Sequence, residues 1–130
     1  MEMKKTKWRQ VFSAVGRSGL LDLKNKSGVY LIKESATGKV VYVGYSSSNL
    51  YKVIMRHFYY WKDQRQIRVS YSFPGLYKVR AVVTTPAMAM KLEKYLILKL
   101  QPEDNPDKLE NYTLSAADLK TGQAFEEAPF

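Results

Sequence analysis

The sequence predicts an α+β fold, and three observations support that class. Two short runs rich in β-branched and aromatic residues, Ser27 to Lys33 and Val40 to Val43, flank a glycine-containing turn, which is typical of a β-hairpin. Two later segments begin with helix N-capping residues and continue with apolar residues at helical spacing. A third β-rich run separates those helices, so the expected order is strand, strand, helix, strand, helix.

The first 26 residues are expected to form a basic helical extension. Four apolar or aromatic residues in this stretch recur at helical spacing: Trp8, Val11, Phe12 and Val15. This pattern predicts a short amphipathic helix. Gly16 and Gly19 follow the pattern and favour its end.

Glycine and polar residues divide the segments that follow. Glu34 to Lys39 supplies the hairpin turn, with Gly38 at a position where a chain reversal favours glycine. The polar run from Ser46 to Asn49 predicts the N-cap of a first helix. We expect that helix to run from Leu50 to about Trp61 and to pack its apolar face on the sheet. That face carries Leu50, Ile54, Phe58 and Trp61.

The third strand is expected from Tyr77 to Thr84, where β-favouring residues alternate. Thr85 followed by Pro86 is typical of the start of a helix, because proline is tolerated at the first helical position. Pro102 predicts that this second helix ends near Leu100.

Composition excludes several classes of site. The chain has 130 residues, which suggests one domain. It has no cysteine, which excludes disulfides and thiolate metal sites, and its one histidine, His57, excludes a multi-histidine cluster. No stretch approaches the roughly 18 apolar residues that span a bilayer. The N-terminus lacks an apolar secretory segment, so a cytoplasmic protein without a membrane partner is expected.

The net charge is +9, and it is spread unevenly. Nineteen of the 21 Lys and Arg residues lie in residues 1–100, and seven of the 12 Asp and Glu residues lie in residues 101–130. A body this basic favours a polyanion such as nucleic acid. A solvated basic surface and attraction to an anionic membrane are the alternatives. Residues 107–130 are expected to be an acidic tail, with a short helix near Ser115 to Lys120 before the chain frays.

Glu93 lies on the apolar face of the expected second helix, among leucine and isoleucine residues. Burying a lone carboxylate is unfavourable, so either a cation meets it or its pKa rises. An ion pair with a nearby Lys or Arg, or a solvent-facing position, is the alternative. A carboxylate without an acidic neighbour suits a single Mg²⁺-like ion that keeps most of its waters.

Two tyrosines, Tyr30 and Tyr42, are expected on neighbouring strands. Tyrosine is common in strands, so a role in the core or on the sheet surface is the alternative. To accept a proton from water, a phenol needs its pKa of about 10 lowered, which a nearby metal or a cluster of cations would do.

Basic residues near the first helix and in the segment after it are candidates for binding phosphate. They are Lys39, Lys52, Arg56, Lys62, Arg65 and Arg68. Guanidinium binds phosphate oxygens bidentately, and His57 lies beside one of these arginines. The later basic residues are interleaved with Tyr59, Tyr60, Trp61 and Tyr71, a composition suited to following a nucleic-acid backbone. Solvated surface is the alternative for the whole group.

Several of these residues together resemble the GIY-YIG endonuclease family. Gly28-Val29-Tyr30 resembles the first family motif, and Tyr42-Val43-Gly44 resembles the second. The helix around Glu93 resembles the metal-binding helix of the family, and Pro102 and Asn105 resemble the residues that follow it. The four elements occur in the family's order and cover about residues 27–106.

The resemblance implies a three-stranded antiparallel sheet flanked by helices, and metal-dependent hydrolysis of DNA phosphodiester bonds with one Mg²⁺ or Mn²⁺ ion. Tyr30 would activate the attacking water, and Tyr42 would assist or position it. Glu93 would hold the metal, and Asn105 would support the geometry of the site. His57 matches a position that is His or Tyr in several members.

Val53 departs from the family pattern, because the catalytic arginine usually lies four residues before His57. Arg56 and Lys52 are the candidates to replace it. Helical side chains lean toward the N-terminus, so Arg56 could reach back along the helix. Without such a cation, the alternative is a catalytically weakened or inactive nucleic-acid-binding module. A protein-interaction or membrane-surface module fits the charge but not the placement of Glu93.

Overall fold

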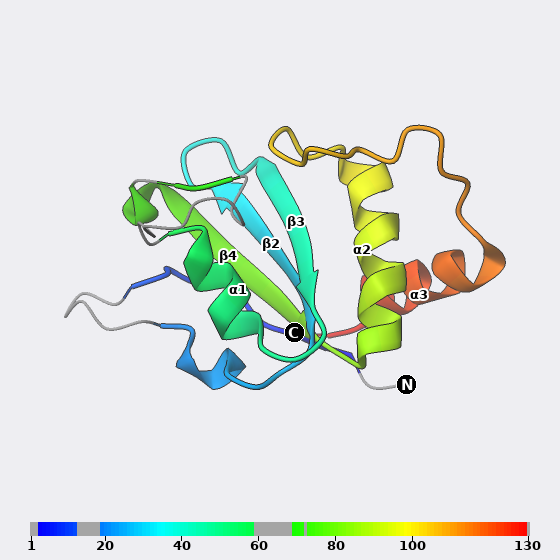
Figure 1. Ribbon diagram of the computed structural model, residues 1–130, viewed down its shortest axis with the longest axis horizontal. Coiled ribbons are helices and arrows are strands. Elements are labelled where there is room, and N and C mark those ends of the chain that lie inside the picture. Colours follow the sequence, from blue (N-terminus) through cyan, green and yellow to red (C-terminus); the bar gives the residue numbers. More distant parts are fainter. Residues whose placement is uncertain (1–2, 13–18, 59–68, 72, 130) are drawn as a thin grey trace.

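The computed structural model describes residues 3–12, 19–58, 69–71 and 73–129. The body of an antiparallel sheet consists of three seven-residue strands: β2 (Gly28–Glu34), β3 (Val40–Ser46) and β4 (Tyr77–Val83). A two-residue strand, β1 (Lys4–Lys5), adds to one edge, and the strand order is β1-β4-β2-β3 (Figure 1). The α+β class is confirmed. The expected three-stranded sheet is wrong by one strand, because β1 makes it four-stranded.

The helix expected near the N-terminus is wrong for the part of it that the structure describes. The backbone N–H of Thr6 donates to Ala81 O at 2.8 Å, and Arg9 and Val79 exchange two backbone hydrogen bonds of 2.9 and 2.8 Å. This segment therefore runs extended along the outer edge of β4. That edge offers unpaired donors and acceptors, whereas a helix of so few residues is marginal by itself.

The apolar residues of this segment are used for packing rather than for a helix. Val11 is fully buried, and Phe12 packs against the same core. Val15 lies outside the described residues. The short 3₁₀-helix η1 (Leu21–Leu23) follows and buries Leu23.

The hairpin between β2 and β3 is confirmed. Gly38 adopts a φ of 71° in its turn, and its N–H donates to Glu34 O at 2.9 Å. A glycine at this position avoids the steric cost of a left-handed backbone. β3 continues to Ser46, three residues beyond the end predicted from the sequence.

Helix α1 (Leu50–Arg56) begins as expected, because the Asn49 side chain accepts a hydrogen bond from the Lys52 N–H at 3.2 Å. It ends earlier than predicted. The N–H groups of His57 and Phe58 bond to carbonyls three residues back, which tightens the last turn and ends the helix. Trp61, the expected end, lies outside the described residues.

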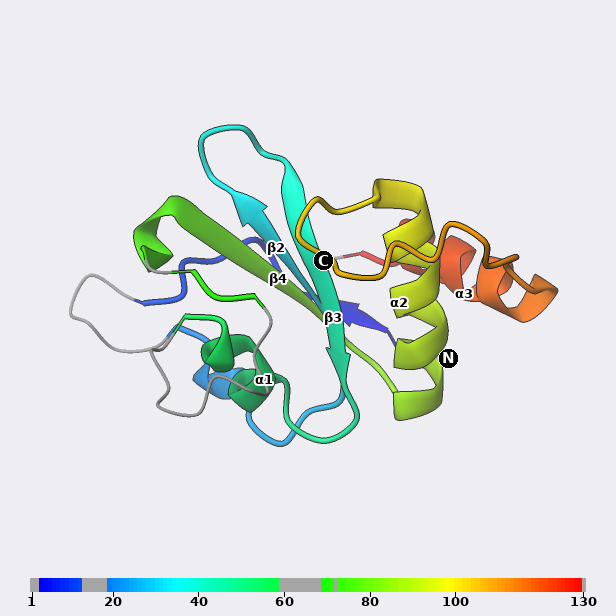
Figure 2. The same ribbon diagram turned by 45° about the horizontal axis from the view of Figure 1, so that its top comes forward.

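Helix α2 (Pro86–Leu100) matches its prediction at both ends. Thr85 caps it by accepting from the Met88 N–H at 3.3 Å, and Gln101 ends it with a left-handed φ of 46°. α2 packs against β2 and β3. Figures 1 and 2 show the sheet between α1 on one side and α2 on the other.

The C-terminal region is more ordered than the predicted frayed tail. Helix α3 (Ala116–Glu127) begins at a capping box formed by Ser115 and Asp118 and packs along α2. The ring of Tyr95 occupies the space where a side chain on Gly122 would project, and Phe125 is buried. The missing side chain at Gly122 allows the two helices to approach closely.

Alternation along the strands divides the buried side chains between the two faces of the sheet. The core on the α1 side includes Tyr30, Ile32, Leu50, Ile54 and Val79. The core on the α2 side includes Val29, Leu31, Val43, Leu92 and Leu96. In the described part of the chain, no helix has the length and apolar character needed to cross a bilayer.

Candidate active site

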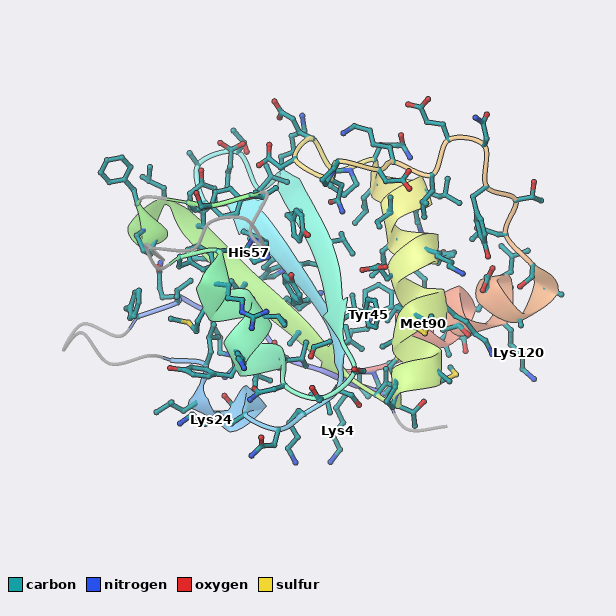
Figure 3. The ribbon with its side chains drawn as sticks, in the orientation of Figure 1. Lys4, Lys24, Tyr45, His57, Met90 and Lys120 are labelled. Atoms are coloured by element: carbon teal, nitrogen blue, oxygen red, sulfur yellow. The ribbon has the colours of Figure 1, made fainter. Side chains whose placement is uncertain are left out.

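Tyr30 and His57 form the centre of the candidate site. The Tyr30 hydroxyl lies 2.8 Å from His57 Nε2, and both side chains are buried. Tyr30 comes from the middle of β2, and His57 caps the C-terminus of α1. Figure 3 shows His57 at the end of that helix, between it and the sheet.

The hydrogen bond at Nδ1 of His57 determines which ring nitrogen carries the proton. Nδ1 lies 2.8 Å from Val69 O, and a carbonyl only accepts, so Nδ1–H donates. Burial lowers the pKa of His57, and the hydrogen bond to Val69 opposes that effect only in part. The imidazole is therefore neutral near pH 7, and its Nε2 accepts a hydrogen bond from the Tyr30 hydroxyl.

Tyr42 and Tyr71 extend this pair into a cluster of rings. The Tyr42 ring centroid lies 4.6 Å from that of His57 and 6.0 Å from that of Tyr30. The Tyr71 ring also lies near His57, with centroids 6.3 Å apart. Tyr42 is only partly buried, so it is the most exposed of these three tyrosines.

Glu93 lies within electrostatic range of Tyr30. Burial is the main cause that raises the pKa of Tyr30 well above its ordinary value, and the charges of Tyr42 and Glu93 add to it. Tyr30 lies over the edge strand β3, because Gly44 leaves room for its ring, and α2 packs against that strand. The Glu93 charge therefore reaches Tyr30, although α2 and the Tyr30 ring lie on opposite sides of the sheet.

Among the described residues, the Glu93 carboxylate lacks a compensating partner. Burial raises the pKa of Glu93 to about 7, and the charge of Lys94 opposes this shift only in part. In the described part of the chain, this carboxylate has neither a hydrogen bond nor an ion pair. It behaves as the sequence argument anticipates for a partly buried acid without a cation, rather than as half of a salt bridge.

The donors near Glu93 limit the kind of metal that it would hold. Within the described ranges, no three His, Asp or Glu side chains come together as a ligand group. A dedicated protein cage is therefore not formed by these residues. One partly exposed carboxylate suits a Mg²⁺-like ion whose remaining ligands are water and substrate phosphate.

Asn105 stabilises the backbone next to the site. Its side chain is buried, and it bonds both backbone groups of Val43: Oδ1 accepts from the N–H at 2.9 Å, and Nδ2 donates to the carbonyl at 2.8 Å. Val43 lies between Tyr42 and Gly44, so this amide holds the second tyrosine motif in place.

Two residues that the sequence argument did not assign to the site also contribute. The Tyr71 hydroxyl donates to Asp104 Oδ2 at 2.9 Å, and the Tyr71 N–H donates to His57 O at 2.6 Å. Burial first, then the bond to Asp104, raises the pKa of Tyr71. The available signal was weak: Tyr71 ends an alternating Val69-Ser70-Tyr71 run, and Asp104 precedes Asn105.

Among the residues that the structure describes, no cation contacts the phenols at the position left by Val53. Val53 itself packs against the core on the α1 side. Arg56 is partly exposed, and among the described residues it has no hydrogen bond or ion pair. Lys52 is exposed on α1. The charges that shift the pKa of Glu93 and Tyr30 belong to other residues.

The remaining predicted phosphate-binding residues differ in status. Lys39 lies in the β2–β3 turn and forms an exposed ion pair with Glu103 at 3.4 Å. Such surface pairs contribute about 0–1 kcal/mol and exchange readily with other anions. Three others lie outside the described residues: Lys62, Arg65 and Arg68.

Comparisons of this chain with models of protein families, with curated proteins and with solved structures found no match. Its function is therefore inferred from the arrangement of its own side chains.

Proposed function

We propose that this protein is a divalent-metal-dependent DNA endonuclease of the GIY-YIG type that hydrolyses phosphodiester bonds. One observation carries the proposal: the buried Tyr30 hydroxyl lies 2.8 Å from His57 Nε2, and the Tyr42 ring lies against both side chains. Phosphodiester hydrolysis requires a route for the water proton and stabilisation of charge on the phosphate. The phenol–imidazole pair suits the first task and the carboxylate suits the second through a cation.

The proton would pass from water to His57 through Tyr30. As the water proton moves to the Tyr30 oxygen, the phenolic proton moves to Nε2 of His57. This paired transfer avoids a free phenolate, which burial disfavours. The Val69 carbonyl then stabilises the imidazolium, because it accepts the hydrogen bond from Nδ1.

Glu93 is the residue that would hold the divalent ion. When bound, such an ion supplies Lewis-acid stabilisation of the charge that develops on the phosphate. The carboxylate must be ionised to bind it, so affinity is expected to rise with pH through about 7. Asn105 would keep the neighbouring strand in register while the substrate binds.

A nucleic-acid-binding module without catalysis is the second candidate function. Val53 favours it, because a valine cannot neutralise phosphate charge and instead packs on the core. Losing one stabilising donor of this kind typically lowers the rate by about 10²–10³-fold. The net charge of +9 would still favour binding to DNA.

The two candidates separate in a plasmid-nicking assay with Mg²⁺ or Mn²⁺, run beside a binding titration on duplex DNA in EDTA. We expect nicking by the natural sequence and none by Glu93→Gln. Glu110→Gln, which changes an exposed acid outside the site, is the matched control and should nick at the unaltered rate.

Nicking by Glu93→Gln at the full rate would remove the carboxylate from the mechanism. Binding without nicking in either metal would favour the second candidate. In that case Val53→Arg tests whether the missing cation is the reason, because it should restore cutting if the rest of the site is intact.

A further inference from the structure

A basic patch lies on the face of the sheet opposite to Tyr30 and His57. The patch consists of Lys5, Trp8, Lys33, Lys78 and Arg80. Cross-strand pairs place the strand residues on that face: Lys33 pairs with Lys78, and Leu31 of the α2-side core pairs with Arg80. α2 packs on β2 and β3 (Figure 1), whereas the patch lies toward β4 and β1.

Trp8 organises the patch. Lys33 Nζ lies 4.3 Å from the centroid of the Trp8 ring, and the Arg80 guanidinium carbon lies 5.3 Å from it. Arg80 Nε also donates to Thr6 O at 3.0 Å, which orients the guanidinium. Two cations on one indole ring form a preorganised group, because each has already lost much of its rotational freedom.

The patch concentrates positive charge. Burial first, and then the charge of Arg80, lowers the pKa of Lys5. Glu126 opposes this effect, but its carboxylate is also bonded by Lys99. Holding like charges together is unfavourable in a free protein, and a polyanion would remove that cost.

We propose that the basic patch binds the sugar-phosphate backbone of a duplex DNA segment distinct from the segment at the phenols. The proposal rests on the proposed function only in taking DNA as the polyanion. Lysine and arginine side chains neutralise phosphates and release counterions, and Trp8 adds a flat contact surface.

The position of the patch defines the class of substrate. The sheet separates the patch from Tyr30 and His57, so we expect a duplex bound at the patch to be a different segment from one bound at the phenols. DNA that offers two duplex segments, as a branched, looped or crossing substrate does, would contact both faces at once.

Tryptophan fluorescence gives a direct test, because the chain has two tryptophans and one of them belongs to the patch. Trp61→Phe leaves Trp8 as the sole tryptophan, and long-wavelength excitation avoids the tyrosines. The probes are a short duplex DNA and vesicles of equal parts phosphatidylglycerol and phosphatidylcholine. We expect the duplex to quench or shift Trp8 emission in a saturable, salt-sensitive way. A response to the vesicles and none to the duplex would overturn the proposal in favour of a membrane surface.

Charge removal gives the second test. Lys33→Ala/Lys78→Ala is compared with Lys24→Ala/Lys120→Ala, which removes the same charge at two exposed sites labelled in Figure 3. Each lost phosphate contact should make the fall of log K with log salt less steep by about 0.9. The Lys33→Ala/Lys78→Ala variant should bind the duplex roughly tenfold more weakly. The control pair should leave the slope unaltered.

Equal losses in the two pairs would show a general effect of net charge and would overturn the proposal. Nicking is measured on the same samples, so the two proposals can fail separately. Nicking with an inert patch would refute only the patch, whereas patch-dependent binding without nicking would refute only the nuclease.

Discussion

Gly44 stands directly opposite Tyr30 in the β2–β3 pair, and the Tyr30 ring fills the space that a side chain at position 44 would occupy. A Cβ there would collide with the ring carbons and the hydroxyl oxygen. The glycine of the second motif is therefore required by the tyrosine of the first. The two motifs form one packing unit, although they lie on different strands.

Gly44→Ala should destabilise the protein and displace Tyr30. Overpacking of this kind costs about 1–3 kcal/mol, because the ring must leave its rotamer or the strands must separate. Urea unfolding measures the loss, and nicking activity reports the displaced hydroxyl. Gly75→Ala is the control, because a Cβ there meets nothing within 4 Å. Equal stability of the two variants would contradict the packing argument.

Tyr30→Phe should keep the ring contacts and remove the proton route. The loss of the hydroxyl leaves Nε2 of His57 without its donor, which costs about 1–2 kcal/mol of unfolding free energy. Nicking should fall by about 10²-fold or more. Tyr51→Phe, on the partly exposed side of α1, should alter neither quantity. Full nicking by Tyr30→Phe would mean that the hydroxyl takes no part in hydrolysis.

Glu93→Gln should stabilise the metal-free protein at alkaline pH. Folding raises the pKa of Glu93 from about 4.5 to about 7, so the folded state favours the protonated acid. The stability that this preference adds to the folded state is complete below about pH 4.5 and is lost as the pH rises through 7. With allowance for partial exposure, the variant should gain about 1–3 kcal/mol over the natural sequence at pH 8.

The measurement for Glu93 is urea unfolding in EDTA at pH 5 and pH 8. The gain should be smaller at pH 5, and Glu110→Gln should show no such difference between the two conditions. A gain that does not depend on pH would contradict the shifted pKa. Added Mg²⁺ should stabilise the natural sequence and leave Glu93→Gln unaffected, because binding to the folded state adds to stability.

Asn105→Asp should destabilise the protein most at neutral pH. The carboxylate replaces a donor, so one of its oxygens would face the Val43 carbonyl without a proton between them. We expect a loss of about 2–3 kcal/mol at pH 7 and partial recovery near pH 4, where the protonated acid can donate. Amide exchange at Val43 should quicken in parallel.

Asn111→Asp makes the same chemical change at an exposed position and serves as the control. It should leave unfolding and the exchange of the Val43 amide unaltered. If the two variants behaved alike, the amide pairing at Val43 would contribute nothing to stability.

The central hairpin and α2 could be predicted from the sequence because their signals are local. Gly38 marks the turn, and Thr85 with Pro86 marks the start of α2. The spacing of Tyr30 and Tyr42 also predicted neighbouring strands. The lone position of Glu93 predicted either a cation beside it or a raised pKa, and the second of these is found. Each of these properties depends on residues close in sequence or on one helix face.

The failed predictions concern partners distant in sequence. Trp8, Val11 and Phe12 have helical spacing, but the open edge of β4 determines the conformation of their backbone. The second half of α3 follows an acidic, polar run. It is ordered because Gly122 packs against the Tyr95 ring of α2. The contribution of Tyr71 and Asp104 likewise depends on a contact across 33 residues.

The Asn105 amide has a consequence for the association of the protein with other chains. β3 is an edge strand, and its outward N–H and C=O at Val43 are the groups that a foreign strand would use. The Asn105 side-chain amide hydrogen-bonds both groups, as one residue of a neighbouring strand would. The middle of this edge is therefore protected from pairing with strands of other chains, which is how exposed edges lead to aggregation.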